Sequence, residues 1–245
     1  MCGKVLSELG ADVVKIERPG GDPARNIGPF YHDIPDPEKS LYWFAYNTNK
    51  RGITLNIQTS RGQEIFKQLV TSADFVLESF PPGYLNDLGL GYSQLSEINP
   101  KIIMTSITPF GQTGPYKDYK TCDLVVMAMG GFIYVCGDAD RPPVRISVEQ
   151  AYPIAGAEAA AGSLIAHHFR TLTGEGQWVD VSIRECIVRA LFIELGFWDA
   201  SREVPVRSGP RRRRMATYQR DIWPCQDGHL AGAIAGGRLG TETLR

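Results

Sequence analysis

Short apolar runs alternate with amphipathic helical segments over most of this chain, and this alternation limits the folds open to it. Residues 12–17, 74–77 and 101–106 have the length and apolar content of buried strands. Between the first two lies segment 59–71, whose apolar residues fall on one helical face. Strands that alternate with helices in this way form a parallel sheet, which helices cover on both faces. We therefore predict an α/β fold.

The other expected elements continue this pattern along the chain. Residues 18–40 are polar and rich in Gly and Pro, and we expect a long loop there, of a length that is often functional. Residues 111–120, rich in Gly, Pro and Lys, are a second irregular segment. After Ala200 the composition again indicates a loop, which carries four consecutive arginines at 211–214. The remaining elements are strands at 53–57, 132–135, 178–183 and a strand start at 229–234, and helices at 4–9, 84–88, 93–98, 123–129, 154–170 and 185–198.

Charge and composition exclude several classes of protein. The chain has 26 Lys and Arg and 27 Asp and Glu, which gives a net charge of −1. The protein therefore has no overall positive potential that would favour binding of nucleic acid. A hydrophobic content of 43% is not that of a disordered chain, and no apolar run has the roughly 18–20 residues of a membrane span. The five scattered cysteines argue against a disulfide framework or a zinc site. Since residues 1–10 carry no secretory signal, we predict a soluble, cytoplasmic protein.

The two ends of the chain depart from the usual order of an α/β domain. Such a domain begins with its first strand, whereas this chain begins within the helix that would follow that strand. It ends at Arg245, shortly after the strand start at 229–234. We interpret both ends as truncated, and a naturally short protein is the alternative.

Four sequence motifs occur together in an order that resembles one known family. They are GADVVKIERPGGDPAR at 10–25, NTNKRGITLNI at 47–57, ADFVLESFPPGYLNDLGLGYSQLSEINPKIIMTSITPFGQTGPY at 73–116, and TGEGQWVDVSI at 173–183. In this register the chain resembles the family III CoA-transferases, which include formyl-CoA, carnitine and benzylsuccinate CoA-transferases, and the related α-methylacyl-CoA racemases. The resemblance covers about residues 10–183 and weakens afterwards.

The resemblance implies a Rossmann-like parallel-sheet large domain and a small domain. Residues 1–200 would be the CoA-binding large domain without its first strand, and residues 201–245 a linker and the start of a largely absent small domain. The implied partner is another family III chain, in a homo- or heterodimer whose subunits are threaded through each other as linked rings. The implied substrates are an acyl-CoA and a small carboxylic acid, with no permanently bound cofactor and no nucleic-acid or membrane partner.

The resemblance also indicates where CoA would bind. Its phosphates require cations, and Arg18 and Lys120 match CoA-contacting residues of the family. Arg18 follows an expected strand, at the edge where open α/β sheets bind ligands. Asp87 reverses the charge of an arginine that contacts CoA in formyl-CoA transferase. The other positions assigned to the CoA site are Leu55, Gln58, Ser79, Phe80 and Asp123.

The largest departure from the family concerns the nucleophile. Family members use an aspartate carboxylate that attacks the thioester and then carries CoA itself. Counting back from Thr173, with Gly156 and Gly162 as anchors, places that position at Tyr152. A phenol has a pKa near 10 and does not form this carboxylate intermediate. The nearest acid is Glu149, which could alternatively be an N-terminal helix acid.

A second departure lies at 210–220. The glycine-rich loop of formyl-CoA transferase would fall here, but the sequence is PRRRRMATYQR. We expect a solvated loop or a subunit contact, and anion binding in a partner's site is the alternative. A racemase would require a His/Asp pair as its acid and base. The positions that align with this pair are Cys122 and Tyr152, so neither residue of the pair is present.

Three hypotheses remain open. The chain is an active CoA-transferase that uses another carboxylate such as Glu149, or a subunit without a nucleophile that pairs with an aspartate-bearing homologue. The third possibility is a CoA-binding or regulatory protein without chemistry. The segment IWPCQDGHL at 222–230 loosely resembles the two-subunit benzylsuccinate branch, which favours the second hypothesis.

Overall fold

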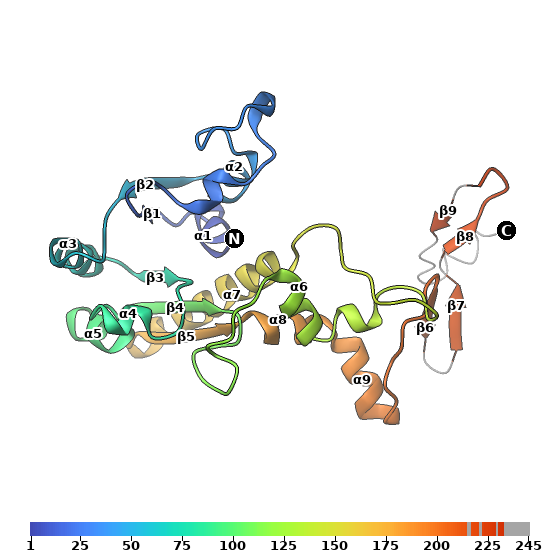
Figure 1. Ribbon diagram of the computed structural model, residues 1–245. Coiled ribbons are helices and arrows are strands. Elements are labelled where there is room, and N and C mark those ends of the chain that lie inside the picture. Colours follow the sequence, from blue (N-terminus) through green and yellow to red (C-terminus); the bar gives the residue numbers. More distant parts are fainter. Residues whose placement is uncertain (215–216, 221, 229, 233–245) are drawn as a thin grey trace. The chain divides into compact units, whose positions relative to one another are not determined.

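The computed structural model describes the chain except for residues 215–216, 221, 229 and 233–245 (Figure 1). Two compact units make up the chain. The first contains Met1–Val126 and Glu149–Ile187, and the second contains Met127–Val148 and Val188–Arg245. The predicted division at residue 200 remains a prediction, and each unit is described by itself.

All strands of the first unit are parallel to their neighbours. β1 (Val13–Glu17) pairs with β2 (Lys50–Thr54) in one sheet. In a second sheet, β4 (Ile103–Thr108) lies between β3 (Phe75–Glu78) and β5 (Gln177–Ser182). The α/β fold with parallel sheets predicted from the alternating segments is therefore confirmed.

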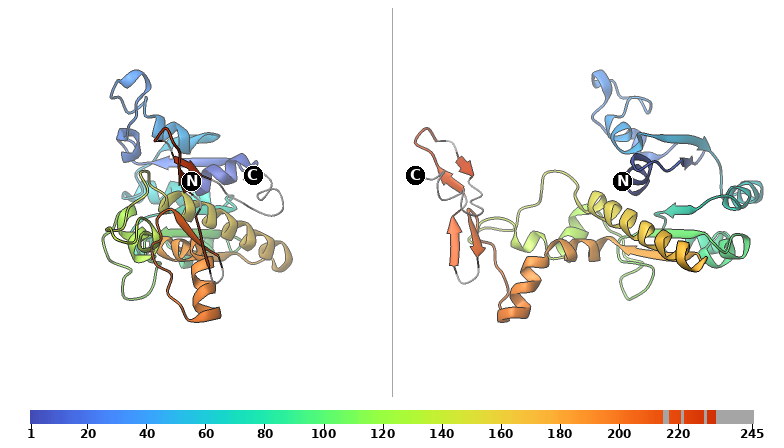
Figure 2. Two further views of the ribbon diagram at one scale, coloured as in Figure 1. Left: turned by 90° about the vertical axis from the view of Figure 1, so that its right-hand side faces the viewer. Right: turned by 180° about the vertical axis from the view of Figure 1, so that it is seen from behind.

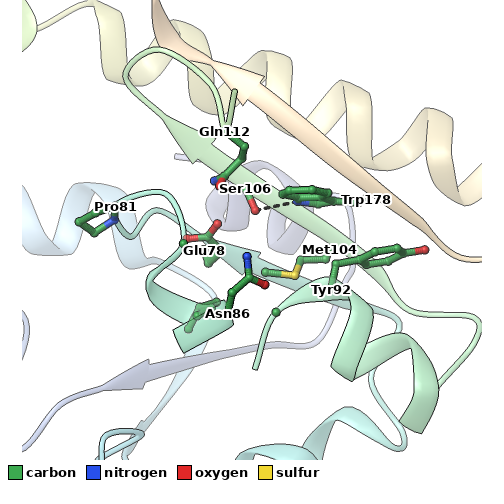
Figure 3. A pocket seen from close by; sticks show the side chains of 11 residues that line it. Glu78, Pro81, Asn86, Tyr92, Met104, Ser106, Gln112 and Trp178 are labelled. Atoms are coloured by element: carbon green, nitrogen blue, oxygen red, sulfur yellow. Dashed lines mark hydrogen bonds between the residues drawn. The ribbon is translucent and has the colours of Figure 1, made fainter. Parts of the chain in front are cut away.

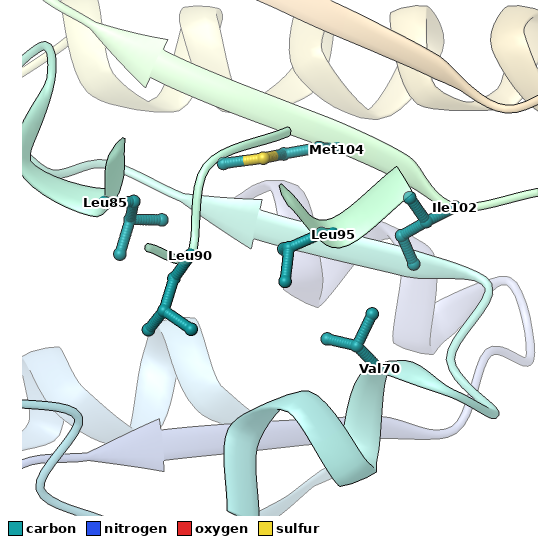
Figure 4. Close-up of a cluster of buried hydrophobic side chains, with 6 residues drawn as sticks. All are labelled: Val70, Leu85, Leu90, Leu95, Ile102 and Met104. Carbon is teal, nitrogen blue, oxygen red and sulfur yellow. The ribbon is translucent and has the colours of Figure 1, made fainter. Parts of the chain in front are cut away.

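Neighbouring residues of β4 show that helices cover both faces of its sheet. Successive side chains of a strand point to opposite faces. Met104 joins a buried cluster with helices α3 (Ser60–Val70), α4 (Tyr84–Asp87) and α5 (Tyr92–Ile98) (Figure 4). The next side chain, Thr105, is hydrogen-bonded to Ser163 of α7 at 2.8 Å. The other members of the buried cluster are Val70, Leu85, Leu90, Leu95 and Ile102.

Alanine and glycine residues let α7 (Ala151–Thr173) pack closely against its neighbours. The helix lies along β4, β5 and α1 (Cys2–Glu8) (Figure 2). A side chain at Gly156 would overlap Met1, so the glycine is needed for the approach of α1. The helix ends at Gly174, which has a left-handed backbone with φ 80°.

Some predicted boundaries in the first unit were wrong. The strand expected at 53–57 lies at Lys50–Thr54, because pairing with β1 sets its register and most of its side chains are exposed. The expected loop of residues 18–40 contains two short 3-10 turns, Pro23–Asn26 and Tyr31–Asp33. A helix that was not predicted, α2 (Leu41–Asn47), follows it and is capped by the Ser40 hydroxyl, which accepts from the Trp43 amide.

The second unit and the helices that lead into it, α6 (Asp123–Met129) and α8 (Ile183–Ala190), differ more from the expectations. The strand predicted at 132–135 is a 3-10 turn at Ile133–Val135, which follows the positive φ of Gly131. The predicted helix 185–198 is two helices, α8 and α9 (Phe192–Ser201), since Leu191 leaves the helical backbone conformation. Helix α6 is confirmed.

The expected loop after Ala200 contains two antiparallel hairpins. The first pairs β6 (Arg211–Arg214) with β7 (Thr217–Arg220), so the arginine run is a strand. The second pairs β8 (Ile222–Pro224) with β9 (Leu230–Gly232). The predicted strand start at 229–234 includes β9, while residues 229, 233 and 234 lie outside the described residues. Among the described residues, none of the helices has both the length and the apolar character that a membrane span needs.

Candidate functional site

The start of α7 is held by a carboxylate from another segment. Asp123 accepts hydrogen bonds from the backbone nitrogens of Gln150 at 3.0 Å and Ala151 at 2.8 Å. The first amides of a helix have no partner within the helix, and an acidic group near them also interacts favourably with the helix dipole. Asp123 therefore positions the beginning of α7, whereas the sequence suggested only a CoA contact.

Tyr152 lies in the first turn of α7, at the position predicted to replace the nucleophile. Its side chain is 36% exposed. Burial raises the pKa of the phenol above its ordinary value of 10, and the negative charges of Glu149 and Asp123 raise it further. At neutral pH the Tyr152 phenol is therefore un-ionised and a poor nucleophile.

Two further groups lie around Tyr152. Burial raises the pKa of Tyr42, and the charge of Glu149 raises it further. Glu149 is exposed, and its charge acts on both tyrosines. The start of α7 thus combines neutral phenols with carboxylates, and Tyr42 is a member of this site that the sequence analysis missed.

Several predicted CoA residues follow the carboxyl ends of strands. Arg18 comes directly after β1, Leu55 after β2, and Ser79 after β3. Arg18 is exposed, and its Nε donates to the Gly21 carbonyl at 3.3 Å. The Leu55 amide donates to the Glu17 carbonyl at 2.8 Å, which ties the ends of β1 and β2 together. Carboxyl ends of parallel strands are where open α/β sheets bind ligands.

A small aromatic surface joins two of the predicted residues. The rings of Phe80 and Tyr84 lie 4.8 Å apart, and the Tyr84 hydroxyl accepts from Gln58 Nε2 at 3.1 Å. Phe80 is 39% exposed, so its ring is available to a ligand. Tyr84 links Gln58 to Phe80 but was not predicted. Phe80 precedes α4, so no helical spacing links the two rings, and the sequence carried no signal for their contact.

The described contacts do not unite all the predicted residues. They connect Gln58 with Phe80 through Tyr84, and Asp123 with the start of α7, but join neither group to Arg18. Lys120 is an exposed residue between the loop that follows β4 and the start of α6. Among the described residues, no group of three or more His, Cys, Asp or Glu side chains could hold a metal ion.

A small pocket lies beside these segments, near the ends of β3 and β4 (Figure 3). Glu78 and Ser106 line it, and Trp178 Nε1 donates to Ser106 Oγ at 3.0 Å. Burial raises the pKa of Glu78. The cavity is about 20 Å³, room for about one water molecule, so it does not hold a nucleotide.

The role of Asp123 at the start of α7 can be tested through stability. We expect Asp123→Ala to lower the free energy of unfolding by about 1–2 kcal/mol, because two helix amides lose their acceptor. Asp123→Asn retains an acceptor oxygen and should cost less. The control is Asp118→Ala, at an exposed position of the preceding loop. Equal melting curves for Asp123→Ala and Asp118→Ala would contradict the anchoring role.

Comparison with known proteins decides the family. The family model "CoA-transferase family III" matches residues 1–243. The chain belongs to CoA-transferase family III. Its relatives include the succinyl-CoA:(R)-benzylsuccinate CoA-transferase subunit BbsE of Thauera aromatica, which is 40% identical over 96% of this chain and 56% of its own length. The succinyl-CoA–D-citramalate CoA-transferase of Chloroflexus aurantiacus is 37% identical over 93% of this chain and 55% of its own length.

A solved structure agrees with the assignment to this family. A CaiB/BaiF family protein from Brucella suis superposes with a TM-score of 0.82 at 36% identity. The match covers 93% of this chain and 60% of that protein. The family III resemblance inferred from the four motifs is thus confirmed. The chain spans just over half the length of the curated relatives that it matches.

Proposed function

We propose that this chain is a family III CoA-transferase subunit that binds CoA without supplying the nucleophile. In the complete enzyme, CoA would move between an acyl-CoA and a carboxylic acid. The observation that carries the proposal is Tyr152, a neutral phenol in the first turn of α7 where the family resemblance places an aspartate. The nucleophilic carboxylate would come from a second family III chain.

CoA binding is supported by groups in the segments that follow the first four strands. Arg18 offers an exposed guanidinium to a phosphate, and Lys120 offers a second cation. The exposed ring of Phe80, backed by Tyr84, offers a surface on which an adenine can stack. We propose that Leu55, Gln58 and Ser79 line the same nucleotide.

Asp123 has a different role in this proposal. Its carboxylate would orient the start of α7 rather than touch CoA, because it already accepts two backbone hydrogen bonds.

The chemistry of CoA transfer explains why a phenol is insufficient. A carboxylate attacks the thioester carbonyl, the C–S bond breaks, and the CoA thiolate leaves while a mixed anhydride forms. The thiolate then attacks the enzyme's acyl carbon, which releases the donor acid and leaves CoA on the enzyme. The acceptor carboxylate attacks this thioester in turn, the C–S bond breaks, and a second mixed anhydride forms. The released thiolate then attacks the acceptor's acyl carbon, which gives the new acyl-CoA and restores the enzyme carboxylate. Each step requires a carboxyl carbon on the protein, which a tyrosine side chain lacks.

The names of two relatives support a second chain and a class of donor. One is a benzylsuccinate CoA-transferase subunit, and another is the succinyl-CoA–L-malate CoA-transferase beta subunit of Chloroflexus aurantiacus. Both names contain succinyl-CoA. We propose succinyl-CoA as the donor and a small carboxylic acid as the acceptor. The proposed location is the cytoplasm, with which the five free cysteines agree.

Co-expression with an aspartate-bearing homologue tests this proposal. The two chains together should transfer CoA from succinyl-CoA to an acceptor acid, whereas this chain alone should bind CoA and transfer none. The matched control replaces the homologue's aspartate with asparagine and should abolish transfer. Transfer by this chain alone that is lost in Glu149→Gln would contradict the proposal and favour Glu149 as nucleophile. CoA binding without any transfer by the pair would instead favour a regulatory homologue.

A further inference from the structure

The loop that carries Arg18 is closed onto the end of β1 by an ion pair. Glu17, the last residue of β1, accepts at Oε2 from Arg25 Nε at 2.7 Å and at Oε1 from Arg25 Nη2 at 2.9 Å. The side chain of Glu17 is 8% exposed and that of Arg25 is 19% exposed. A guanidinium that contacts a carboxylate through two hydrogen bonds fixes the direction of both side chains. The two ends of the loop are therefore held together.

The same carboxylate also holds the middle of the loop. Glu17 Oε2 accepts from the Asp22 backbone nitrogen at 3.0 Å. The Asp22 side chain accepts from the Ala24 amide at 2.9 Å and from Lys15 Nζ at 2.8 Å. The pKa of Glu17 is lowered, chiefly because Arg25 donates hydrogen bonds to it, so the carboxylate is ionised at neutral pH. The shape of the loop therefore depends on an ionised Glu17.

All three guanidinium nitrogens of Arg25 are engaged within this part of the chain. Nη1 donates to Glu38 Oε1 at 3.1 Å, and Nε and Nη2 donate to Glu17. Arg25 Cζ also lies over the buried ring of Trp43 in α2, 4.2 Å from the ring centroid, where a cation is favoured. Arg25 therefore supports the loop and is not itself a phosphate ligand.

Arg18 has different surroundings from Arg25. It is exposed, its Nε donates to the Gly21 carbonyl at 3.3 Å, and the Gly21 amide donates to the Arg18 carbonyl at 2.9 Å. Gly21 in turn lies against the ion pair. A β-carbon there would be 3.1 Å from Arg25 Cδ and 3.7 Å from Glu17 Oε2. The ion pair thus supports the residue to which the Arg18 side chain is hydrogen-bonded.

We propose that Glu17 and Arg25 are positioning residues for CoA binding. Their ion pair holds the turn at 18–21 in the shape that presents the Arg18 guanidinium to a phosphate of CoA. Neither residue touches CoA, so both act only through Arg18. This inference rests on the proposed function of the chain, since it takes Arg18 as the phosphate contact.

A double-mutant cycle, measured by calorimetric titration of the chain with CoA, tests this role. Glu17→Gln combined with Arg25→Met removes one charge of each sign, so the overall potential is unchanged and no buried charge is left unpaired. We expect the affinity for CoA to fall by on the order of tenfold, the effect of losing one charge-assisted contact. Arg18→Met alone should have a similar effect. In a chain that already carries Arg18→Met, removal of the ion pair should change the affinity by less than about twofold.

A second ion pair of the same sheet provides the matched control. Arg51 of β2 donates from Nε to Asp12 Oδ1 at 2.9 Å, and both side chains are exposed. Asp12→Asn combined with Arg51→Met should leave the affinity for CoA unchanged. Thermal melting verifies that each variant is folded. Glu17→Gln alone leaves Arg25 paired with Glu38, so it is a milder second variant and should weaken CoA binding by a smaller factor.

The possible results separate this inference from the proposed function. A natural chain that binds no CoA overturns both. If the natural chain binds CoA and removal of the Glu17–Arg25 ion pair leaves the affinity unchanged, only the positioning role is overturned. Equal losses of affinity with and without Arg18→Met overturn the positioning role as well, because the ion pair would then act independently of Arg18.

Discussion

Replacing Tyr152 with aspartate is expected to give this chain an enzyme-bound CoA thioester that the natural chain does not form. An exposed aspartate is almost fully ionised at pH 7, whereas about one phenol in a thousand is ionised at that pH. The raised pKa of Tyr152 makes its ionised fraction smaller still. The new carboxylate would stand at the start of α7, which Asp123 holds in place. The measurement is intact-protein mass spectrometry after incubation with succinyl-CoA.

Controls separate the carboxylate from the smaller side chain. Tyr152→Asn has the size of aspartate without its charge and should form no adduct. Hydroxylamine should remove the adduct of Tyr152→Asp, because it cleaves thioesters. If Tyr152→Asp binds CoA and still forms no adduct, Tyr152 does not occupy the nucleophile position. The alignment that placed it there, counted back from Thr173 through Gly162 and Gly156, would then be wrong.

Gly176→Ala is expected to destabilise the first unit more than any other substitution proposed for this chain. An added β-carbon would overlap the Ile102 carbonyl oxygen and lie 2.8 Å from the Ile102 nitrogen. Both atoms are backbone, so the strands must separate to make room. The Gly176 amide also donates to the Pro100 carbonyl at 2.9 Å, next to the first residues of β4 and β5. We expect a loss of about 3 kcal/mol or more in the free energy of unfolding.

The neighbouring motif glycine provides a matched control. Gly174 has a left-handed backbone but open space where a β-carbon would lie. Gly174→Ala should therefore cost only about 1 kcal/mol, from backbone conformation alone. Chemical denaturation of both variants measures the difference. Equal losses would show that β4 and β5 do not approach each other as closely at Gly176 as described.

Strand and helix positions were predictable where burial produces a clear pattern of apolar residues in the sequence. β4 is almost wholly buried, and its apolar run gave its position directly. Helix α3 has a one-sided apolar face and was also found. By contrast, β2 is mostly exposed and its register depends on β1, so the prediction was three residues late. The arginines of β6 lack the apolar alternation of a strand, so the sequence did not predict their local antiparallel pairing with β7.

The strand ends that carry two of the candidate site residues were predictable, whereas the contacts of the candidate residues were not. The strand ends that carry Arg18 and Ser79 followed from the alternating pattern and the family motifs. Asp123 could not be recognised as the anchor of α7, because its partners lie 27 and 28 residues away. The association of Tyr42 with Tyr152 depends on folding in the same way. Local sequence predicts secondary structure better than it predicts such distant partners.

The central claim is that this chain binds CoA while another chain carries the nucleophile. The most direct measurement is the location of the enzyme-bound CoA thioester in the co-expressed pair, by peptide mass spectrometry after incubation with succinyl-CoA. We predict the thioester on the homologue's aspartate and none on this chain. A thioester on Glu149 or any other residue of this chain would contradict the claim.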